Sequence, residues 1–200
     1  MLGLFGRPPL ESDFLIVGLG NPGDPYLDTR HNVGHMVIDR LCALLKIEPA
    51  GGERIAVART VLEGKRIALI KPATFMNTSG PRVKAALEKF NVLPANLIII
   101  HDDLDLDFAK VRVKQGGGTG GHRGLNSVIA SLGADEFSRI RIGIGRPPGR
   151  MDPSDFVLSP FSPKEWPEME IALAEAADAA IAVVRDGAST AMNRYNKGRK

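Results

Sequence analysis

Cysteine is almost absent from this chain of 200 residues, which contains only Cys42. A single cysteine cannot form a disulfide bond within the chain. Its position in an apolar helical pattern with Leu41 and Leu44 is typical of a core residue and not of a nucleophile. The sequence therefore argues against a disulfide-bonded scaffold and against thiol catalysis.

Long apolar runs are absent as well. A helix needs about 20 consecutive apolar residues to cross a bilayer, and no stretch of this sequence approaches that length. Residues 1–13 are too short for a secretion signal and are interrupted by two glycines and two prolines. We therefore expect a soluble, cytoplasmic protein.

The residues that are present suit one globular domain. A chain of this length with 44% hydrophobic residues buries one sizeable core before it needs to divide. We expect residues 1–200 to form a single domain, with residues 1–13 as an N-terminal extension and residues 186–200 as a basic tail. The last part of this tail, residues 194–200, either attracts nucleic acid or is a frayed end.

The apolar pattern predicts alternating strands and helices. Strands are expected at residues 14–19, 97–100, 111–113 and 139–144, a hairpin at 55–62 and 66–70, and helices at 31–46, 79–90, from about 122, and at 164–185. This order predicts an α/β fold of three layers, in which helices flank a central mixed sheet. Residues 147–163 are rich in proline and serine and are interpreted as a surface connection.

Positive charge is concentrated in one part of the chain. Residues 110–150 carry eight basic and two acidic side chains, whereas the net charge of the whole chain is +3. Segregated positive charge is typical of a surface that binds a polyanion. A solvated basic face with a disordered tail would give the same distribution, so charge alone leaves both interpretations open.

Two glycine-rich loops look like phosphate-binding motifs, but each lacks residues that this chemistry requires. Residues 18–23 have the spacing of a dinucleotide fingerprint, yet Pro22 and Pro25 offer no N–H and delay the start of the next helix. Residues 116–121 are followed by His122 and Arg123, where a P-loop needs a lysine and then a serine or threonine. We therefore expect no nucleotide cofactor. The second loop, residues 116–121, is expected to let a ligand approach its backbone closely.

Two patterns suggest metal ligands, and both are incomplete. His31 and His35 have the spacing of a zinc pair on a helix, but asparagine follows the first histidine where zinc peptidases have glutamate. Residues 103–107 begin like a calcium loop, with Phe108 and Lys114 where the loop needs glycine and a bidentate glutamate. We therefore expect no metal ion.

His31 and Asp102 each follow a predicted buried strand, where open α/β sheets place their ligand sites. A histidine held by a carboxylate can take a proton from water. No serine or cysteine has the context of a nucleophile elbow, so water would be the attacking group. Spacing alone does not bring the two residues together. In the alternative interpretation, His31 caps its helix and Asp102 is a loop acid.

The combined motifs resemble those of one known family. They are, in chain order, VGLGNPG at 17–23, Tyr26, TRHN at 29–32, KPATFMN at 71–77 with Ser79 and Gly80, HD at 101–102 with Leu104 and Asp105, GGGTGGH at 116–122 with Gly124 and Leu125, and RIRIGIG at 139–145. This ordered set resembles the bacterial peptidyl-tRNA hydrolases. The resemblance implies a monomeric α/β fold, no cofactor, and hydrolysis of the ester that joins a peptidyl group to the terminal ribose of tRNA.

The resemblance also implies roles for individual residues. His31 is expected to be the catalytic base, Asp102 to orient it, and Asn21 to assist at the ester carbonyl. The residues expected to hold the peptidyl and 3′-terminal parts of the substrate are Asn21, Tyr26, Met76, Asn77 and His122. An asparagine side chain suits a peptide because it offers both a donor and an acceptor without a charge.

Within the basic region, the resemblance implies that Lys114 and Arg141 bind the 5′ phosphate of the tRNA, with looser help from Arg112 and Arg139. Arg123 departs from the family, whose best-known members have asparagine there. Arginine has donors only, so Arg123 is left out of the catalytic set.

Two rival functions follow from the same residues. A related scaffold serves as a noncatalytic RNA-binding factor in plastid splicing, but RNA binding alone gives no reason to keep His31, Asp102, Asn21 and Asn77 together. A metal-dependent peptidase is the second rival, and it would be sensitive to chelators.

Overall fold

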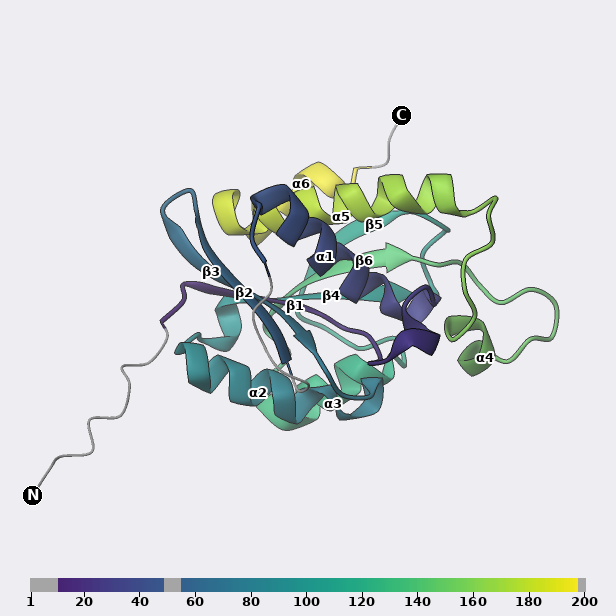
Figure 1. Cartoon of the computed structure of the whole chain (residues 1–200), viewed down its shortest axis with the longest axis horizontal. Coiled ribbons are helices and arrows are strands. Elements are labelled where there is room, and N and C mark those ends of the chain that lie inside the picture. Colours follow the sequence, from purple (N-terminus) through teal and green to yellow (C-terminus); the bar gives the residue numbers. More distant parts are fainter. Residues whose placement is uncertain (1–10, 49–54, 198–200) are drawn as a thin grey trace, which may run out of the picture.

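The described residues form one mixed sheet between two layers of helices (Figure 1). The computed structural model describes residues 11–48 and 55–197. Its strands, in spatial order, are β2 (Ile55–Leu62), β3 (Lys65–Pro72), β1 (Phe14–Gly18), β4 (Leu97–Asp103), β6 (Ser138–Gly143) and β5 (Val111–Gln115). The four central strands are parallel, and the edge strands β2 and β5 are antiparallel to their neighbours. The predicted mixed α/β sheet is confirmed.

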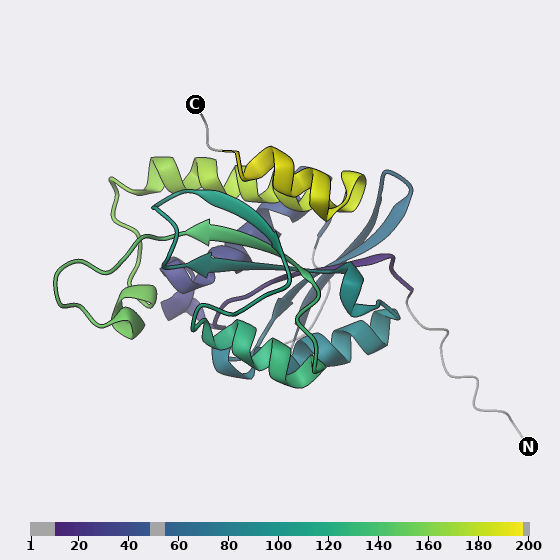
Figure 2. The same cartoon turned by 180° about the vertical axis from the view of Figure 1, so that it is seen from behind.

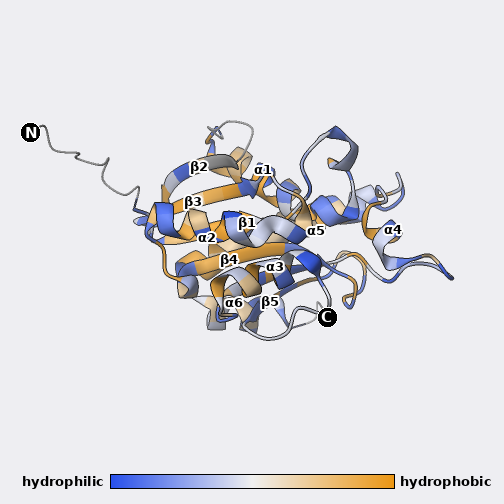
Figure 3. Cartoon of the chain, turned by 90° about the horizontal axis from the view of Figure 1, so that it is seen from below, coloured by the Kyte–Doolittle hydropathy of each residue, from blue (hydrophilic) through white to orange (hydrophobic). Residues whose placement is uncertain are grey.

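The helices cover both faces of the sheet (Figures 1 and 2). One face carries α1 (Val33–Leu45), α5 (Trp166–Asp186) and α6 (Ala188–Tyr195), and the other carries α2 (Ser79–Phe90) and α3 (Arg123–Leu132). Because side chains alternate along a strand, Ile98 and Ile100 pack under the first layer and Leu97 and Ile99 under the second. The central strands are therefore apolar on both faces, and their ribbons are largely orange in Figure 3.

Several predicted elements are confirmed within a few residues, one helix begins later than expected, and one short helix was missed. The hairpin of β2 and β3 and the helix α2 lie where the sequence placed them. The helix expected from residue 31 instead begins at Val33, after a 3₁₀ turn, η2 (Arg30–Asn32). Residues 147–163, interpreted as a surface connection, contain a further short helix, α4 (Pro153–Val157), which buries Phe156.

The C-terminal residues are more structured than a basic tail would be. Tyr195, at the end of α6, is buried. The side-chain amide of Asn196 donates to the carbonyl of Val113 at 2.8 Å and accepts from its N–H at 2.9 Å. These bonds satisfy backbone groups on the exposed edge of β5, which otherwise invites pairing with another chain. Residues 198–200 lie outside the described residues.

At the other end, the expected extension is partly joined to the sheet. Ser12 donates its N–H to the carbonyl of Phe90 at 2.9 Å, and Asp13 pairs with Arg66 at 3.0 Å. Residues 1–10 lie outside the described residues. Cys42 is buried, as expected for a core residue. Among the described residues, no helix combines the length and the apolar character needed to cross a membrane.

Candidate active site

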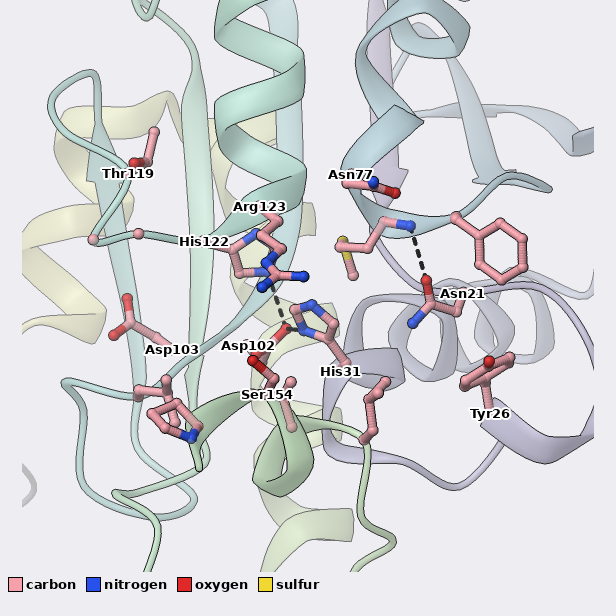
Figure 4. A pocket seen from close by; sticks show the side chains of 18 residues that line it. Asn21, Tyr26, His31, Asn77, Asp102, Asp103, Thr119, His122, Arg123 and Ser154 are labelled. Atoms are coloured by element: carbon pink, nitrogen blue, oxygen red, sulfur yellow. Dashed lines mark hydrogen bonds and ion pairs between the residues drawn. The ribbon is translucent and has the colours of Figure 1, made fainter. Parts of the chain in front are cut away.

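A cavity of about 450 Å³ opens at the carboxyl ends of the parallel strands (Figure 4). Five segments form its walls: the loops after β1 and β3, the end of β4, the glycine loop before α3, and α4. The lining residues are Asn21, Tyr26, His31, Phe75, Met76, Asn77, Asp102, Asp103, Leu104, Thr119, Gly120, Gly121, His122, Arg123, Pro153, Ser154, Val157 and Leu158. This is the edge at which open α/β sheets bind their ligands.

The structure brings His31 and Asp102 together, which sequence spacing alone could not do. The Nδ1 of His31 lies 2.8 Å from Oδ1 of Asp102, and both side chains are buried at the base of the cavity. Since an ionised carboxylate can only accept, Nδ1 carries the proton and donates it. The lone pair of His31 is therefore on Nε2, which is the atom available to act as a base.

The backbone around His31 is set by close packing of α1 against β1. A Cβ atom on Gly18 would lie 2.0 Å from the carbonyl oxygen of Gly34, and one on Gly34 would lie 2.4 Å from the carbonyl oxygen of Leu19. Only glycine permits this approach. It brings the η2 turn, and with it His31, over the end of the sheet.

Asp102 remains ionised inside the protein because two histidines face it. Burial raises the pKa of its carboxyl, but electrostatic attraction to His31 and His122 and the hydrogen bonds from their N–H groups outweigh burial and hold this pKa well below its usual range. The Nε2 of His122 lies 3.1 Å from the same oxygen, Oδ1. One carboxylate oxygen thus accepts from both imidazoles.

The hydrogen bonds of His122 also fix its tautomer. His122 is the N-cap of α3, and its Nδ1 accepts from the N–H groups of Gly124 at 3.1 Å and Leu125 at 3.2 Å. Nε2 must then carry the proton that is donated to Asp102. The potential metal-ligand atoms of His31, Asp102 and His122 lie within 4.8 Å of one another. Because the Nε2 of His122 has no free lone pair, this pattern favours shared protons over a metal ion among the three groups.

The zinc pair considered from sequence is not assembled. His31 lies in the η2 turn and not on α1, so the two histidines do not share a helical face. The ring of His35 instead packs against Gly20, where a Cβ would lie 2.6 Å from its Cγ. Burial lowers the pKa of His35 to about 3, so it is neutral. His35 is a packing residue behind the loop that carries Asn21.

Asn21 is held from both sides. Its Oδ1 accepts from the N–H of Met76 at 2.8 Å. The side chain of Asn32 accepts from the N–H of Asn21 at 2.8 Å and donates to its carbonyl at 2.9 Å. Since the oxygen of the Asn21 amide is turned toward the N–H of Met76, the NH₂ donors are the part of this side chain without a hydrogen-bond partner among the described residues. Asn32 belongs to a motif quoted from the sequence, but its supporting role could not be read from it.

The other predicted substrate-binding residues also line the cavity. Tyr26 and Phe75 form an edge-to-face pair with ring centroids 6.4 Å apart. Met76 is buried against Gly124, where a Cβ would lie 2.4 Å from its sulfur. Asn77, in the short turn η3 (Met76–Thr78), is exposed, so its amide has both its donor and its acceptor available.

Sequence reasoning missed the wall formed by α4. Pro153, Ser154, Val157 and Leu158 all line the cavity. A local signal was present: Asp152 caps α4 by accepting from the N–H of Ser154 at 2.7 Å, and proline occupies the first turn. Aspartate followed by proline is a common helix start.

Comparison with known proteins agrees with the motifs. The sequence model of one family, described as Peptidyl-tRNA hydrolase, matches residues 15–200. The chain belongs to the peptidyl-tRNA hydrolase family. It is 48% identical over 191 residues to the peptidyl-tRNA hydrolase of Mycobacterium tuberculosis, covering 94% of this chain and 99% of the relative. It is also 49% identical over 190 residues to the peptidyl-tRNA hydrolase of Rhodococcus opacus, covering 93% of this chain and 99% of that relative.

Solved structures agree with this family membership. The crystal structure of peptidyl-tRNA hydrolase from Acinetobacter baumannii superposes with a TM-score of 0.86 at 33% identity, covering 97% of this chain and 99% of that one. The resemblance inferred from the ordered motifs is confirmed. The departure at Arg123 lies within the cavity wall, where Arg123 is exposed at the first position of α3.

The resemblance to peptidyl-tRNA hydrolases implied that four basic residues bind a phosphate or assist in binding it. These residues fall into two groups. Arg139 is buried and donates to the carbonyls of Gly118 at 2.7 Å and Gly117 at 2.5 Å. Arg112 donates to the carbonyls of Val111 at 2.9 Å and Tyr195 at 3.1 Å. Both arginines thus bind the protein's own backbone: Arg139 uses both terminal nitrogens, whereas both bonds of Arg112 come from Nη1. Their assistance at a phosphate stays a prediction.

Lys114 and Arg141 remain candidates for a phosphate. The register of β5 and β6 pairs Lys114 with Arg139 and Arg112 with Arg141, so all four side chains leave the same face of the sheet. Arg141 donates its Nε to Asp103 at 2.7 Å, which leaves its two terminal nitrogens for another partner. The amine of Lys114 lies beside Gly117, where a Cβ would be 2.8 Å away.

Proposed function

We propose that this cavity hydrolyses the ester bond between a peptidyl group and the 3′ end of tRNA, with His31 as the general base and Asp102 as the group that orients it. The observation that carries this proposal is the 2.8 Å hydrogen bond between His31 and Asp102 at the base of the cavity. Family membership supplies the reaction, and this pair supplies a base of the right kind.

The reaction follows from the free lone pair of His31. Nε2 takes a proton from water, and the water oxygen attacks the ester carbonyl carbon. The tetrahedral intermediate then collapses: the bond from carbon to the ribose oxygen breaks, and that oxygen takes the proton from the imidazolium. Asp102 stabilises the imidazolium and does not take up the proton itself. General-base assistance of this kind is worth about 10² to 10⁴ in rate.

The remaining residues hold the substrate. The NH₂ group of Asn21 donates to the oxyanion, since its own oxygen is engaged by Met76. Asn77 binds the peptide backbone, and Tyr26 and Met76 contact its side chains. Both ring nitrogens of His122 are engaged within the protein, so we propose that His122 meets the substrate through its ring carbons and holds Asp102 in place.

Selectivity for a blocked amino group follows from the charge of the cavity. Asp103 lines the cavity but is paired with Arg141 at 2.7 Å. Burial raises the pKa of Asp103, but the hydrogen bond and charge of Arg141, together with the hydrogen bond from the N–H of Asp105, outweigh burial and lower it. A neutralised carboxylate gives little attraction to a free α-amino group, so peptidyl esters should react faster than aminoacyl esters.

On the tRNA side, Lys114 and Arg141 bind the 5′ phosphate of the acceptor end. We further propose that the chain works as a monomeric single domain in the cytoplasm, without a metal ion or cofactor. Retained activity in a chelator and a monomer mass in solution would support these points, and chelator sensitivity would favour the metal-dependent rival.

The direct test is hydrolysis of N-acetyl-aminoacyl-tRNA, followed by detection of free tRNA and of the released N-acetyl amino acid. His31→Ala should lower kcat by about 10² or more while tRNA binding stays close to that of the parent. Asn193→Ala, at an exposed position of α6 remote from the cavity, is the control for expression and handling. Unchanged kcat in His31→Ala would refute the assignment, and tRNA binding without hydrolysis by the parent would favour the noncatalytic rival.

A further inference from the structure

The residue immediately before His31 is a buried arginine. The side chain of Arg30 is 8% exposed, and its Nη2 lies 3.0 and 3.1 Å from the two carboxylate oxygens of Glu165. Its guanidinium carbon lies 4.5 Å from the ring centre of Phe156 and 4.7 Å from that of Phe161. Arg30 is not part of the cavity lining. Its contacts all belong to one stretch of chain, residues 153–165, which we name the α4 segment.

The backbone joins the same two parts of the molecule. The N–H of Arg30 donates to the carbonyl of Ser159 at 3.1 Å, and Thr29 forms an antiparallel bridge with Pro160. The α4 segment therefore docks on the turn that carries His31. Its other side, through Val157 and Leu158, lines the cavity.

This docking depends on a single compensating charge. The buried cation of Arg30 faces one carboxylate, Glu165, and two aromatic rings, whose faces attract cations. Within the described residues, Nε and Nη1 of Arg30 are buried without a hydrogen-bond partner. Removing one member of a buried pair leaves an uncompensated charge and is costly. The side-chain part of this docking, beside the backbone contacts at Ser159 and Pro160, therefore depends on the Arg30–Glu165 pair.

The same turn positions the opposite wall. Asn32, one residue after His31, holds the backbone of Asn21 through two hydrogen bonds. Three consecutive residues thus fix the α4 segment, the catalytic imidazole and the Asn21 loop. A displacement of the α4 segment would leave the His31–Asp102 bond in place, because Asn32 and the packing of α1 hold the turn that carries His31 independently of that segment.

From these contacts we infer that Arg30 is a positioning residue: through Glu165, Phe156 and Phe161 it docks the α4 segment as the wall that the apolar part of the peptidyl group contacts. This inference rests on the proposed hydrolysis of peptidyl-tRNA. It assigns the Arg30–Glu165 pair to substrate binding and not to proton transfer.

The test compares Arg30→Met and Glu165→Gln with Arg66→Met, a control that breaks the exposed ion pairs of Arg66 with Glu11 and Asp13, away from the cavity. With N-acetyl-leucyl-tRNA, Arg30→Met and Glu165→Gln should each raise KM by about tenfold, the scale of lost apolar contacts in a pocket. Their kcat and its pH profile should stay within about twofold of the parent. With N-acetyl-glycyl-tRNA, which offers no apolar side chain, the rise in KM should be smaller.

Two further measurements separate positioning from general destabilisation. Hydrogen exchange should accelerate in residues 153–165 of Glu165→Gln and stay unchanged in α2. The double variant R30M/E165Q, which removes both charges, should recover part of the lost affinity for substrate, because no buried charge is left unpaired. If Arg30→Met does not fold, Glu165→Gln alone decides.

The inference is overturned if Glu165→Gln lowers kcat with KM unchanged, if both substrates are affected equally, or if exchange in residues 153–165 matches the parent. A parent that hydrolyses neither substrate would instead refute the proposed function. In that case the exchange measurement still decides whether Arg30 docks the α4 segment.

Discussion

Asp102 accepts a hydrogen bond from each of three histidines. His31 and His122 donate to its Oδ1 at 2.8 and 3.1 Å, and His101 donates from Nδ1 to its backbone carbonyl at 2.7 Å. Asp102 can stabilise a cation on His31 in this arrangement only if the other two histidines do not place a positive charge beside the same carboxylate. His122 meets this condition through its fixed tautomer, and His101 meets it through burial. In the proposed mechanism, the imidazolium that forms on His31 is then the cation that Asp102 stabilises.

The buried neutrality of His101 should be visible in the pH dependence of stability. Burial lowers the pKa of His101 from 6.5 to about 3. Below pH 6.5 the unfolded chain takes up a proton that the folded protein does not. The free energy of unfolding should therefore fall as the pH is lowered from 6.5 towards 3, by up to about 1.4 kcal/mol per pH unit from this group.

Replacing the histidine isolates this contribution. His101→Asn keeps a donor for the carbonyl of Asp102 but does not titrate, so its unfolding free energy should fall less steeply between pH 6.5 and 5 than that of the parent. Urea unfolding at several pH values measures both slopes. His35 also has a lowered pKa, but it is present in both proteins and cancels. Equal slopes would show that His101 takes up its proton normally in the folded state.

At the scale of elements, the sheet and its helices could be predicted because their patterns are local. The run at 97–100 is apolar on both faces, and the hairpin turns at Glu63 and Gly64, both with positive φ. The pattern of 79–90 gave the bounds of α2 as observed. Each of these signals lies within a few residues of the structure that it specifies.

The elements that were wrong or missed depend on distant contacts. α6 has serine, threonine and asparagine among its eight residues, which favour helix weakly, and it is held by packing on β5. α4 spans only five residues and docks through Arg30. The η2 turn replaces the first turn of the predicted helix because Thr29 and Arg30 bridge to the α4 segment.

The candidate site shows the same contrast between local sequence signals and distant contacts. The ordered motifs supplied the identities of His31, Asp102, Asn21 and Asn77, but their spacing could not place them around one cavity. The supporting residues were harder to find. Asn32 and Arg139 lie within quoted motifs, yet only three-dimensional contacts reveal that one holds Asn21 and the other holds the glycine loop.

The glycine loop offers a prediction at this scale. Arg139 binds the carbonyls of Gly117 and Gly118, just before Thr119 and the cavity wall. Arg139→Met leaves these carbonyls without their donor and should lower the free energy of unfolding by about 2 kcal/mol. It should also raise KM for N-acetyl-aminoacyl-tRNA, because the loop that leads to His122 loses its support.

Arg112→Met is the matched control for this prediction. Arg112 also donates to two backbone carbonyls, but they belong to β5 and α6 and lie outside the cavity. It should lower stability to a similar extent and raise KM less than Arg139→Met does, because it removes the same charge from this face without removing the support of the glycine loop. If both variants raise KM equally, loss of stability and not loop position explains the effect.

At the scale of the whole molecule, charge and catalysis are brought together by the sheet. The cavity opens at the ends of β1, β3 and β4, while the basic side chains lie on the neighbouring strands β5 and β6. The basic region of the sequence is thus an edge of the same sheet. A tRNA end that enters the cavity would pass this edge, and its phosphates would meet positive charge.

Lys114 is the clearest test of that arrangement. Of the four basic side chains on this face, Arg112, Arg139 and Arg141 have protein partners, whereas none of the described residues forms a hydrogen bond or ion pair with the Lys114 amine. Lys114→Ala should raise KM for substrates with a 5′ phosphate and leave kcat unchanged. Its binding should also depend less on salt, with the slope of log K against log salt reduced by about 1, as one phosphate contact is lost.

Lys84→Ala removes an equal charge at an exposed position of α2 outside the cavity and should leave both KM and the salt slope unchanged. Substrates with and without the 5′ phosphate then separate a local contact from general attraction. If Lys114 binds that phosphate, the variant and the parent should bind the dephosphorylated substrate equally well. If Lys114→Ala weakens both substrates by the same factor, the lysine contributes only to the field of the basic edge, and the 5′ phosphate must be bound elsewhere.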